Sequence, residues 1–159
     1  HHYSLSIEQA KETIIDDSRF MDKSLEHCRV FLGSWKSNYN SWKVLQKQNK
    51  YLLVKYEDLI SKKKTVLIKI FKFLNSLGAN LSIDMIKLNK VIKNTEFEKM
   101  KIKEERETFQ EALIDNKTGK RKIFFNLGPK NNWRETLDQK IKENIEETFK
   151  EEMRELNYL

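Results

Sequence analysis

"YLLVKYEDL", residues 51–59, is a short continuous apolar run that leads into an acidic pair. An apolar run of this length between polar residues is typical of a strand that is buried on both faces of a parallel sheet. The sequence therefore predicts one buried parallel strand at about residues 51–56. A lone strand leaves its backbone groups unpaired, so we expect its sheet partners to come from residues outside this chain or from another chain.

Helical patterns dominate the rest of the sequence, so the expected fold class is α/β with a mostly helical chain. Ser6 and Gln9 have capping-box spacing and predict a helix at about residues 7–17. Residues 22–31, DKSLEHCRVF, have the pattern of a second helical piece. Large side chains at steps of four and three form a stripe that is expected to face a core: Trp35, Tyr39, Trp42 and Leu45.

Further helices are expected after the strand. Apolar side chains within residues 66–77 fall on one face of an amphipathic helix, which Gly78 should end. Ser82 is a candidate cap for the next helix. Thr95 and Glu98 have capping-box spacing and predict another helix, whose first amides are available for a ligand.

The last third of the chain divides into a charged segment and an amphipathic one. Residues 101–122 are charged, weakly periodic and end in turn signals, so they are a candidate mobile lid. Thr136 and Gln139 have capping-box spacing and predict a long C-terminal helix. Its apolar stripe consists of Leu137, Ile141, Ile145, Phe149, Met153 and Leu156. We expect the whole chain, 159 residues long, to form a single domain, residues 1–159.

The net charge of +7 leaves open a basic helical module that binds nucleic acid. The densest faces of such a module are Lys62–Lys64 and Lys120–Lys122. Lysine carries most of the positive charge, however, whereas planar recognition of bases and phosphates favours arginine. We therefore expect no nucleic-acid partner and keep this function as the alternative.

The single cysteine, Cys28, excludes an internal disulfide and fits a reducing compartment, so we expect a cytoplasmic protein. Its expected role is that of a small apolar filler on a helix. No apolar run approaches the roughly 18 residues that a membrane span needs. We expect a soluble protein with no membrane partner and no metal cofactor.

Residues 123–139, IFFNLGPKNNWRETLDQ, hold the only proline of the chain and one of its four glycines. Together with other pieces this corner resembles, in order and approximate spacing, the C-terminal half of the sulfotransferases that use 3′-phosphoadenosine 5′-phosphosulfate (PAPS). The resemblance covers roughly residues 20–159. The matching pieces are GSW at 33–35, Trp42, YLLVKYEDL at 51–59, IFKFLN at 70–75, NTEFEKMK at 94–101 and FFNLGPKNNW at 124–133.

The resemblance implies the C-terminal part of a three-layer, nucleotide-kinase-like P-loop fold. In that family the N-terminal half carries a phosphate-binding loop, a catalytic histidine and an Arg/Ser pair that grips the cosubstrate. None of these is found in this sequence, so the missing N-terminal half is an expected partner, and this segment alone is expected to be inactive. The resemblance supplies no catalytic residue here. A dimerisation motif of some relatives is matched only at its ends, by Arg134 and Glu143, which leaves the oligomeric state open.

The resemblance also implies residues that bind the cosubstrate. The tyrosine of the family's Tyr-Glu-Asp motif is Tyr56, which is expected near the adenine. The family's Thr-Ser-Phe turn corresponds to residues 95–97, in which Thr95 would hydrogen-bond to the base and Phe97 would stack on it. Independently of any family, the same two residues are typical of a helix cap and a core phenylalanine, and this alternative stays open.

The family's Phe-x-Arg-Lys-Gly loop, which binds the 3′-phosphate, corresponds to Phe124, Phe125, Asn126, Leu127 and Gly128. Asn126 and Leu127 thus stand where relatives have arginine and lysine, and two positive charges are missing from a site for a dianion. The loss of one charged hydrogen bond typically weakens binding by about ten- to a hundredfold. Lys130, Arg121 or Arg134 are the candidates to replace these charges, and a hydrophobic loop that only seats the last helix is the alternative.

The implied reaction is transfer of the sulfuryl group from PAPS to an acceptor hydroxyl or amine of a small molecule or glycan. Such chemistry depends on positioning and electrostatics. A sulfotransferase-like remnant without catalysis is a further alternative, because of Asn126 and Leu127. The acceptor itself cannot be derived from these residues.

Overall fold

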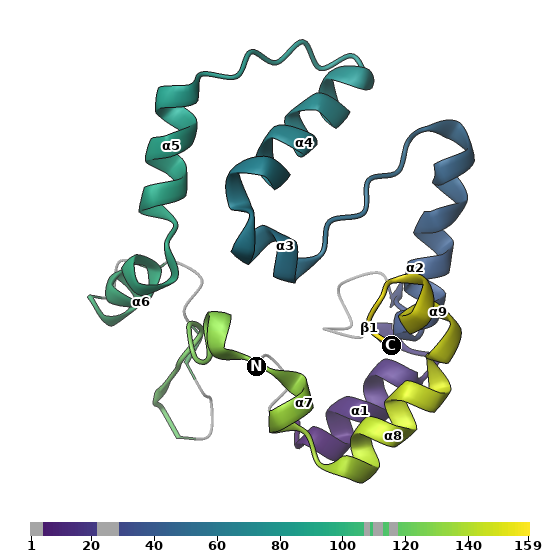
Figure 1. Ribbon diagram of the computed structural model, residues 1–159. Helices are drawn as coiled ribbons and strands as arrows, with labels where there is room; N and C mark the ends of the chain where they lie inside the picture. Colours follow the sequence, from purple (N-terminus) through teal and green to yellow (C-terminus); the bar gives the residue numbers. More distant parts are fainter. Residues whose placement is uncertain (1–4, 22–28, 107–108, 110–112, 115–117) are drawn as a thin grey trace. The chain divides into compact units, whose positions relative to one another are not determined.

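The computed structural model describes residues 5–21, 29–106, 109, 113–114 and 118–159 (Figure 1). Its described residues belong to two compact units. The middle unit spans residues 52–131, and the terminal unit combines the described residues up to 51 with residues 132–159. Both units are built mainly from helices, and each strand is two residues long.

The middle unit places four helices before a small hairpin and a turn. Its elements are α3 (Tyr56–Ser61), α4 (Lys63–Ser76), α5 (Met85–Asn94), α6 (Phe97–Glu105), β3 (Leu113–Ile114), β4 (Arg121–Lys122) and the 3₁₀ helix η2 (Gly128–Lys130). Helix α4 contacts both α3 and α5, and β3 pairs with β4 in antiparallel register. Val66 and Leu88 are the buried apolar residues of this unit among those described. As predicted, α4 is amphipathic and ends just before Gly78, which has a φ of +94°.

The buried strand predicted at 51–56 is not formed. Residues 51–55 belong to no helix or strand, Tyr56 begins α3, and Leu53 is 38% exposed. Lys55 does keep an extended backbone, with φ −82° and ψ 143°. A strand requires a ladder partner, and no described residue pairs with this segment. Glu57 and Asp58 in the first turn of α3 favour a helix start at this point, because acidic side chains stabilise helix N-termini.

Two predicted helix caps in the middle unit are wrong, although both helices form. Asp84, not Ser82, caps α5, since its carboxylate accepts hydrogen bonds from the amides of Ile86 and Lys87 at 2.9 and 3.0 Å. Thr95 does not cap α6, because its hydroxyl donates backward to the carbonyl of Val91 at 2.9 Å. The Val91 carbonyl also accepts from the Thr95 amide at 3.0 Å, so the threonine serves the end of the preceding helix instead of the start of the following one.

The terminal unit is assembled from the two ends of the described chain. Its elements are α1 (Ile7–Ile15), β1 (Phe20–Met21), β2 (Val30–Phe31), α2 (Trp35–Lys43), the 3₁₀ helix η1 (Val44–Gln48), α7 (Trp133–Thr136), α8 (Gln139–Thr148) and α9 (Lys150–Glu155). Helix α1 contacts α2 and α8, and Figure 1 shows α8 beside it. The capping box of α1 is confirmed, with Ser6 and Gln9 exchanging hydrogen bonds of 2.9 and 3.2 Å.

The prediction of a helical piece at residues 22–31 is wrong for its last two residues, which form a strand. Residues 22–28, including Cys28, lie outside the described residues. Val30 and Phe31 form β2, which pairs antiparallel with β1. The rings of Phe20 and Phe31 meet edge to face at 5.3 Å between centroids, and such cross-strand aromatic pairs stabilise a two-stranded ribbon.

The single C-terminal helix expected after residue 136 is divided into α8 and α9 at Phe149, whose φ is −114°. Asp138 caps α8 in place of Thr136. The predicted apolar stripe does face the core, because Phe149 is 2% exposed and meets the ring of Trp35 edge to face at 5.2 Å. Trp42, which was expected on the core-facing stripe of α2, is instead 60% exposed.

The candidate lid at 101–122 is described only in part. Helix α6 ends at Glu105 and the β3–β4 pair occupies the far end of the segment, whereas residues 107–108, 110–112 and 115–117 lie outside the described ranges. The lid therefore stays a prediction. Among the helices that are described, none has both the length and the apolar character required to cross a bilayer.

Candidate functional site

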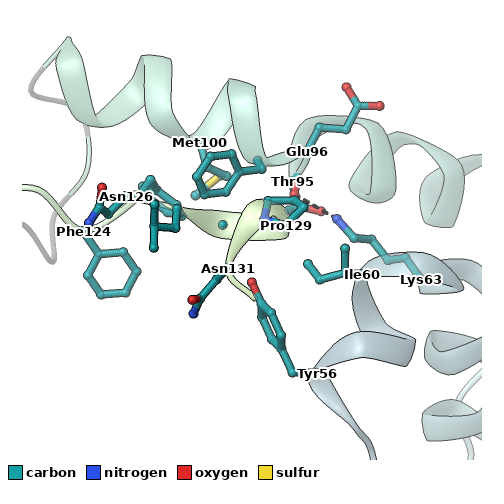
Figure 2. A pocket seen from close by; sticks show the side chains of 14 residues that line it. Tyr56, Ile60, Lys63, Thr95, Glu96, Met100, Phe124, Asn126, Pro129 and Asn131 are labelled. Atoms are coloured by element: carbon teal, nitrogen blue, oxygen red, sulfur yellow. Dashed lines mark hydrogen bonds between the residues drawn. The ribbon is translucent and has the colours of Figure 1, made fainter. Parts of the chain in front are cut away.

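A pocket of about 610 Å³ lies in the middle unit, within the range of roughly 300 to 1,000 Å³ that is usual for small-molecule sites. Its wall combines three segments that are far apart in the sequence: helix α3 with the start of α4, the α5–α6 turn with α6, and the loop after β4 (Figure 2). All of the residues predicted to bind a cosubstrate line it: Tyr56, Thr95, Phe97, Phe124, Phe125, Asn126, Leu127 and Gly128. The sequence motifs place these residues in the same three segments.

Gly128 allows the loop to pass close to α6. Its φ is +53°, a conformation that side-chain-bearing residues rarely adopt. A Cβ atom at this position would lie 2.2 Å from the ring of Phe97, closer than any real contact. The glycine therefore brings together two of the three pocket segments, and Phe97 packs directly against the backbone of the turn.

Aromatic rings form the apolar part of the pocket wall. The rings of Phe97 and Phe125 meet edge to face at 6.0 Å between centroids, and those of Phe124 and Phe125 at 5.0 Å. The ring of Phe109, which does not line the pocket, contacts both loop phenylalanines, with its centroid 5.1 Å from that of Phe124 and 5.0 Å from that of Phe125. This arrangement provides a flat-sided apolar surface, to which a heteroaromatic ring can bind by stacking.

Glu104 anchors the phenylalanine pair to α6. Its side chain is 5% exposed, and its two carboxylate oxygens accept hydrogen bonds from the amides of Phe124 and Phe125 at 2.6 and 2.9 Å. Arg121 donates to the Glu104 carbonyl at 2.9 Å. The loop is therefore held by charge-assisted bonds, which are stronger than neutral ones. Sequence reasoning missed this residue, because an acid in the charged run KIKEERE cannot be distinguished from its solvent-facing neighbours.

The pocket contains little positive charge. Of the described residues that line it, Lys63 is the one cation, and its ammonium donates to the carbonyl of Thr95 at 2.9 Å (dashed in Figure 2). The carboxylate of Glu96, the one lining acid among described residues, is 3.4 Å from the ammonium of Lys99. The pocket is therefore close to neutral, with a lysine at one end of its wall.

None of the three cations proposed from the sequence as replacements lines the pocket. Arg121 is bound to the Glu104 carbonyl, and Arg134 belongs to the terminal unit, where it donates to the carbonyl of Tyr158 at 2.5 Å. Lys130 lies in η2 but is not part of the wall.

The polar groups of the pocket differ in what they can still bind. Thr95 already donates its hydroxyl proton to the Val91 carbonyl, so toward a ligand it acts as an acceptor. Tyr56 is 55% exposed at the start of α3, and Figure 2 shows its ring close to Asn131. In the described part of the chain, no group of His, Cys, Asp and Glu side chains is placed to hold a metal ion.

Several lining residues were not predicted, and helical spacing was a signal for some of them. Ile60 follows Tyr56 by four residues and Met100 follows Phe97 by three, so each shares a helix face with a predicted residue. Lys63 has no such signal, because it begins a new helix after the break at Lys62. The other missed residues are Glu96, Pro129 and Asn131.

Comparisons with known proteins find similarity to sulfotransferases. The family described as Sulfotransferase domain matches residues 1–157. Sulfotransferase 1E1 of Rattus norvegicus is 26% identical over 140 residues, which are 87% of this chain and 44% of that protein. The crystal structure of mouse sulfotransferase SULT7A1 complexed with PAP superposes with a TM-score of 0.61 and 20% identity, covering 95% of this chain and 49% of that one.

The structural likeness shows that the chain shares the fold of a sulfotransferase. The chain spans about half the length of the curated and solved relatives that it matches. Since the family match extends from residue 1 to residue 157, the chain belongs to the sulfotransferase domain family.

Proposed function

We propose that the pocket of the middle unit binds the adenosine 3′,5′-bisphosphate part of PAPS, and that the complete protein is a PAPS-dependent sulfotransferase. The observation that carries this proposal is the convergence of Tyr56, the turn at residues 95–97 and the loop at residues 124–128 on one pocket. The volume suits a nucleotide, and the family membership favours this chemistry. The mouse relative is a sulfotransferase complexed with PAP, the product that PAPS leaves after transfer.

Each segment has a proposed role in binding. Phe97 and Phe125 offer ring surfaces against which the adenine would stack. Tyr56 would contact the base from α3, and the Thr95 hydroxyl would accept a hydrogen bond from its amino group. Gly128 lets the loop backbone approach the ligand closely. We further propose that residues 51–56 complete a strand of a three-layer P-loop fold when the other strands of the sheet are present.

In the proposed reaction, an acceptor oxygen or nitrogen attacks the sulfur of PAPS. The bond from sulfur to the phosphate-bridging oxygen breaks, the new bond to the acceptor forms, and the acceptor proton passes to a base. PAP then leaves with the electron pair of the broken bond. The residues of this chain bind and orient the nucleotide, and we assign none of them as the base. We therefore propose that the chain needs further protein segments for activity, and that the acceptor is a small molecule or glycan in the cytoplasm.

Isothermal titration of the complete protein with PAP tests the binding site. We expect Phe97→Ala and Tyr56→Ala each to weaken PAP binding by about tenfold or more, because each removes ring contact with the base. Tyr56→Phe keeps the ring and removes the hydroxyl, so it separates their contributions to the affinity for PAP. Ile86→Ala serves as the control, since Ile86 is 82% exposed on α5 and does not line the pocket. No binding of PAP at millimolar concentration would refute the function, and unchanged affinity in both alanine variants would refute the site.

A non-catalytic sulfotransferase-like protein is the second candidate. The observation in its favour is that Asn126 and Leu127 contribute no positive charge to the pocket. Such a protein would still bind PAP in the titration but would transfer no sulfuryl group. An assay with labelled PAPS and a panel of phenols, alcohols, amines and glycans distinguishes the two candidates, since transfer to any acceptor excludes the second.

A further inference from the structure

The proposed ligand carries phosphate groups, whereas the loop at residues 124–128 offers no cation to them. Burying phosphate charge without a partner is strongly unfavourable. Within the described wall, Lys63 is the one group that can supply a positive charge, because Glu96 is negative and the other lining residues are neutral. Lys63 is thus the one described side chain of the wall whose positive charge can attract an anion.

The ammonium of Lys63 lies at the pocket and still has hydrogen-bond donors available for a ligand. It donates one hydrogen bond to the Thr95 carbonyl at 2.9 Å, and its side chain is partly buried, whereas Lys62 and Lys64 on either side are exposed. A lysine ammonium has three donors, so two remain for an acceptor. The bond to Thr95 fixes the side chain in advance, which lowers the entropy lost when a ligand binds.

The position of Lys63 in its helix gives a second, independent indication. Lysines occupy positions 62, 63 and 64 at the start of α4, a helix of 14 residues with no acidic residue in its first turn. Cations at a helix N-terminus oppose the helix dipole and destabilise the helix. An anion bound here would interact favourably with both the lysine and the helix dipole. Local rules of stability are commonly broken where function requires it.

We propose that Lys63 binds a phosphate group of the nucleotide and replaces the charge that Asn126 and Leu127 do not provide. This inference rests on the proposed function and adds to it a residue of the anion site. It predicts that Lys63 contributes to the affinity for phosphorylated adenosines and not to the affinity for adenosine itself.

The test compares four ligands and three variants of the complete protein. The ligands are PAP, 3′-AMP, 5′-AMP and adenosine, titrated by calorimetry or, for the weakest, by ligand-observed NMR. Lys63→Met keeps most of the aliphatic stem without charge, and Lys63→Gln also keeps a donor for the Thr95 carbonyl. Lys64→Met is the matched control, since Lys64 is an exposed neighbour of the same charge that does not line the pocket.

We expect both Lys63 variants to weaken PAP binding by about ten- to a hundredfold, and adenosine binding to stay within about twofold. The monophosphate that loses affinity identifies which phosphate the lysine binds. Salt should weaken PAP binding less in the variants than in the parent protein, because a charge pair has been removed. Lys64→Met should leave every affinity within about twofold of the parent value.

Equal weakening of PAP and adenosine in Lys63→Met would overturn the proposal, because it would mean that the lysine only braces the Thr95 turn. Unchanged PAP affinity in both Lys63 variants would overturn it too. In either case the parent protein still binds PAP, so the proposed function survives. If the parent protein itself does not bind PAP, the proposed function fails together with this inference.

Discussion

Gly128 is a single residue whose backbone conformation affects the shape of the pocket. Two separate constraints act there, a φ of +53° and the Phe97 ring that fills the space of a Cβ atom. Gly119 has nearly the same φ, +65°, but nothing lies within 4 Å of where its Cβ atom would be. A comparison of alanine substitutions at the two glycines therefore distinguishes the effect of backbone strain from that of steric contact.

We expect Gly119→Ala to cost about 1 to 2 kcal/mol of folding free energy through backbone strain alone. Gly128→Ala should cost a further 1 to 3 kcal/mol or so, because the new methyl group displaces Phe97, and it should also weaken PAP binding. Urea unfolding and PAP titration of the complete protein measure both effects. In a Phe97→Ala background, Gly128→Ala should lower the free energy of unfolding only about as much as Gly119→Ala does, because the ring contact is absent. Equal costs for the two glycines in the parent protein would contradict the contact with Phe97.

Glu104 gives a second prediction at this scale, since its buried carboxylate satisfies two loop amides. Glu104→Gln places an NH₂ group against one of these amides, so we expect a loss of about 2 kcal/mol in the free energy of unfolding. Glu105→Gln is the control, because Glu105 is the exposed next residue. A Glu104 variant that unfolds at the same urea concentration as the Glu105 variant would show that the loop does not depend on this anchor.

The predicted residues of the site belong to short sequence motifs, whereas some of the missed residues depend on contacts between distant parts of the chain. Tyr56, Thr95, Phe97 and the 124–128 loop were predicted because they belong to short motifs that can be aligned. Lys63 and Glu104 act through contacts with residues 32 and 20 positions away, and neither sits in a recognisable motif. A single sequence contains no signal for contacts of that kind.

At the scale of elements, the start of α2 depends on a cluster of hydroxyls around Asp17. Ser34 is 2% exposed, caps α2 by accepting from the Ser37 amide at 3.1 Å, and donates to the Asp17 carboxylate at 2.5 Å. Ser37 donates to the same carboxylate oxygen. These hydrogen bonds, that of Ser34 first, lower the pKa of Asp17 below its usual value of 3.8.

The sign of the pH effect follows from that direction. Because the pKa of Asp17 is lower in the folded protein than in the unfolded chain, its contribution to stability is present above pH 3.8 or so and disappears as the pH falls through the folded value. Ser34→Ala should cost about 1 kcal/mol near neutral pH through the lost cap, and should make stability less dependent on pH in the acid range. Ser41→Ala, on the same helix but bonded to the Asn38 carbonyl, is the control. Urea midpoints measured from pH 2 to pH 7 test this, and parallel curves for Ser34→Ala and the parent protein would contradict it.

The elements themselves were predictable to different degrees. Helix α4 and the capping box of α1 follow from local periodicity and local hydrogen bonds, so the sequence alone predicts them. The strand at 51–56 needs a ladder with distant residues, and the division of the last helix at Phe149 accompanies its packing against Trp35. Both depend on tertiary contacts, which override local propensity.

At the scale of the whole molecule, part of the positive charge of the chain is paired within its own surface. Lys43 pairs with Glu155, Lys36 lies 3.5 Å from Glu152, and Lys150 lies 3.1 Å from Glu147. Contacts in the two densest basic clusters include one ion pair and two bonds to neutral carbonyls. Lys62 lies 3.6 Å from Asp58, Lys63 is bound to the Thr95 carbonyl, and Arg121 is bound to the Glu104 carbonyl.

That the chain has no nucleic-acid partner stays a prediction, because lysine and not arginine carries most of its positive charge. We expect the complete protein to bind duplex and single-stranded DNA and RNA no more tightly than about 10⁻⁴ M near physiological salt, the weak end of non-specific binding. Dissociation constants measured by filter binding over a series of salt concentrations test this. Replacement of Lys120 and Lys122 by Gln should change neither this weak binding nor the affinity for PAP. Submicromolar binding that falls steeply with salt, and that the Lys120 and Lys122 variant loses, would instead favour the nucleic-acid function, because each released counterion adds to the salt dependence.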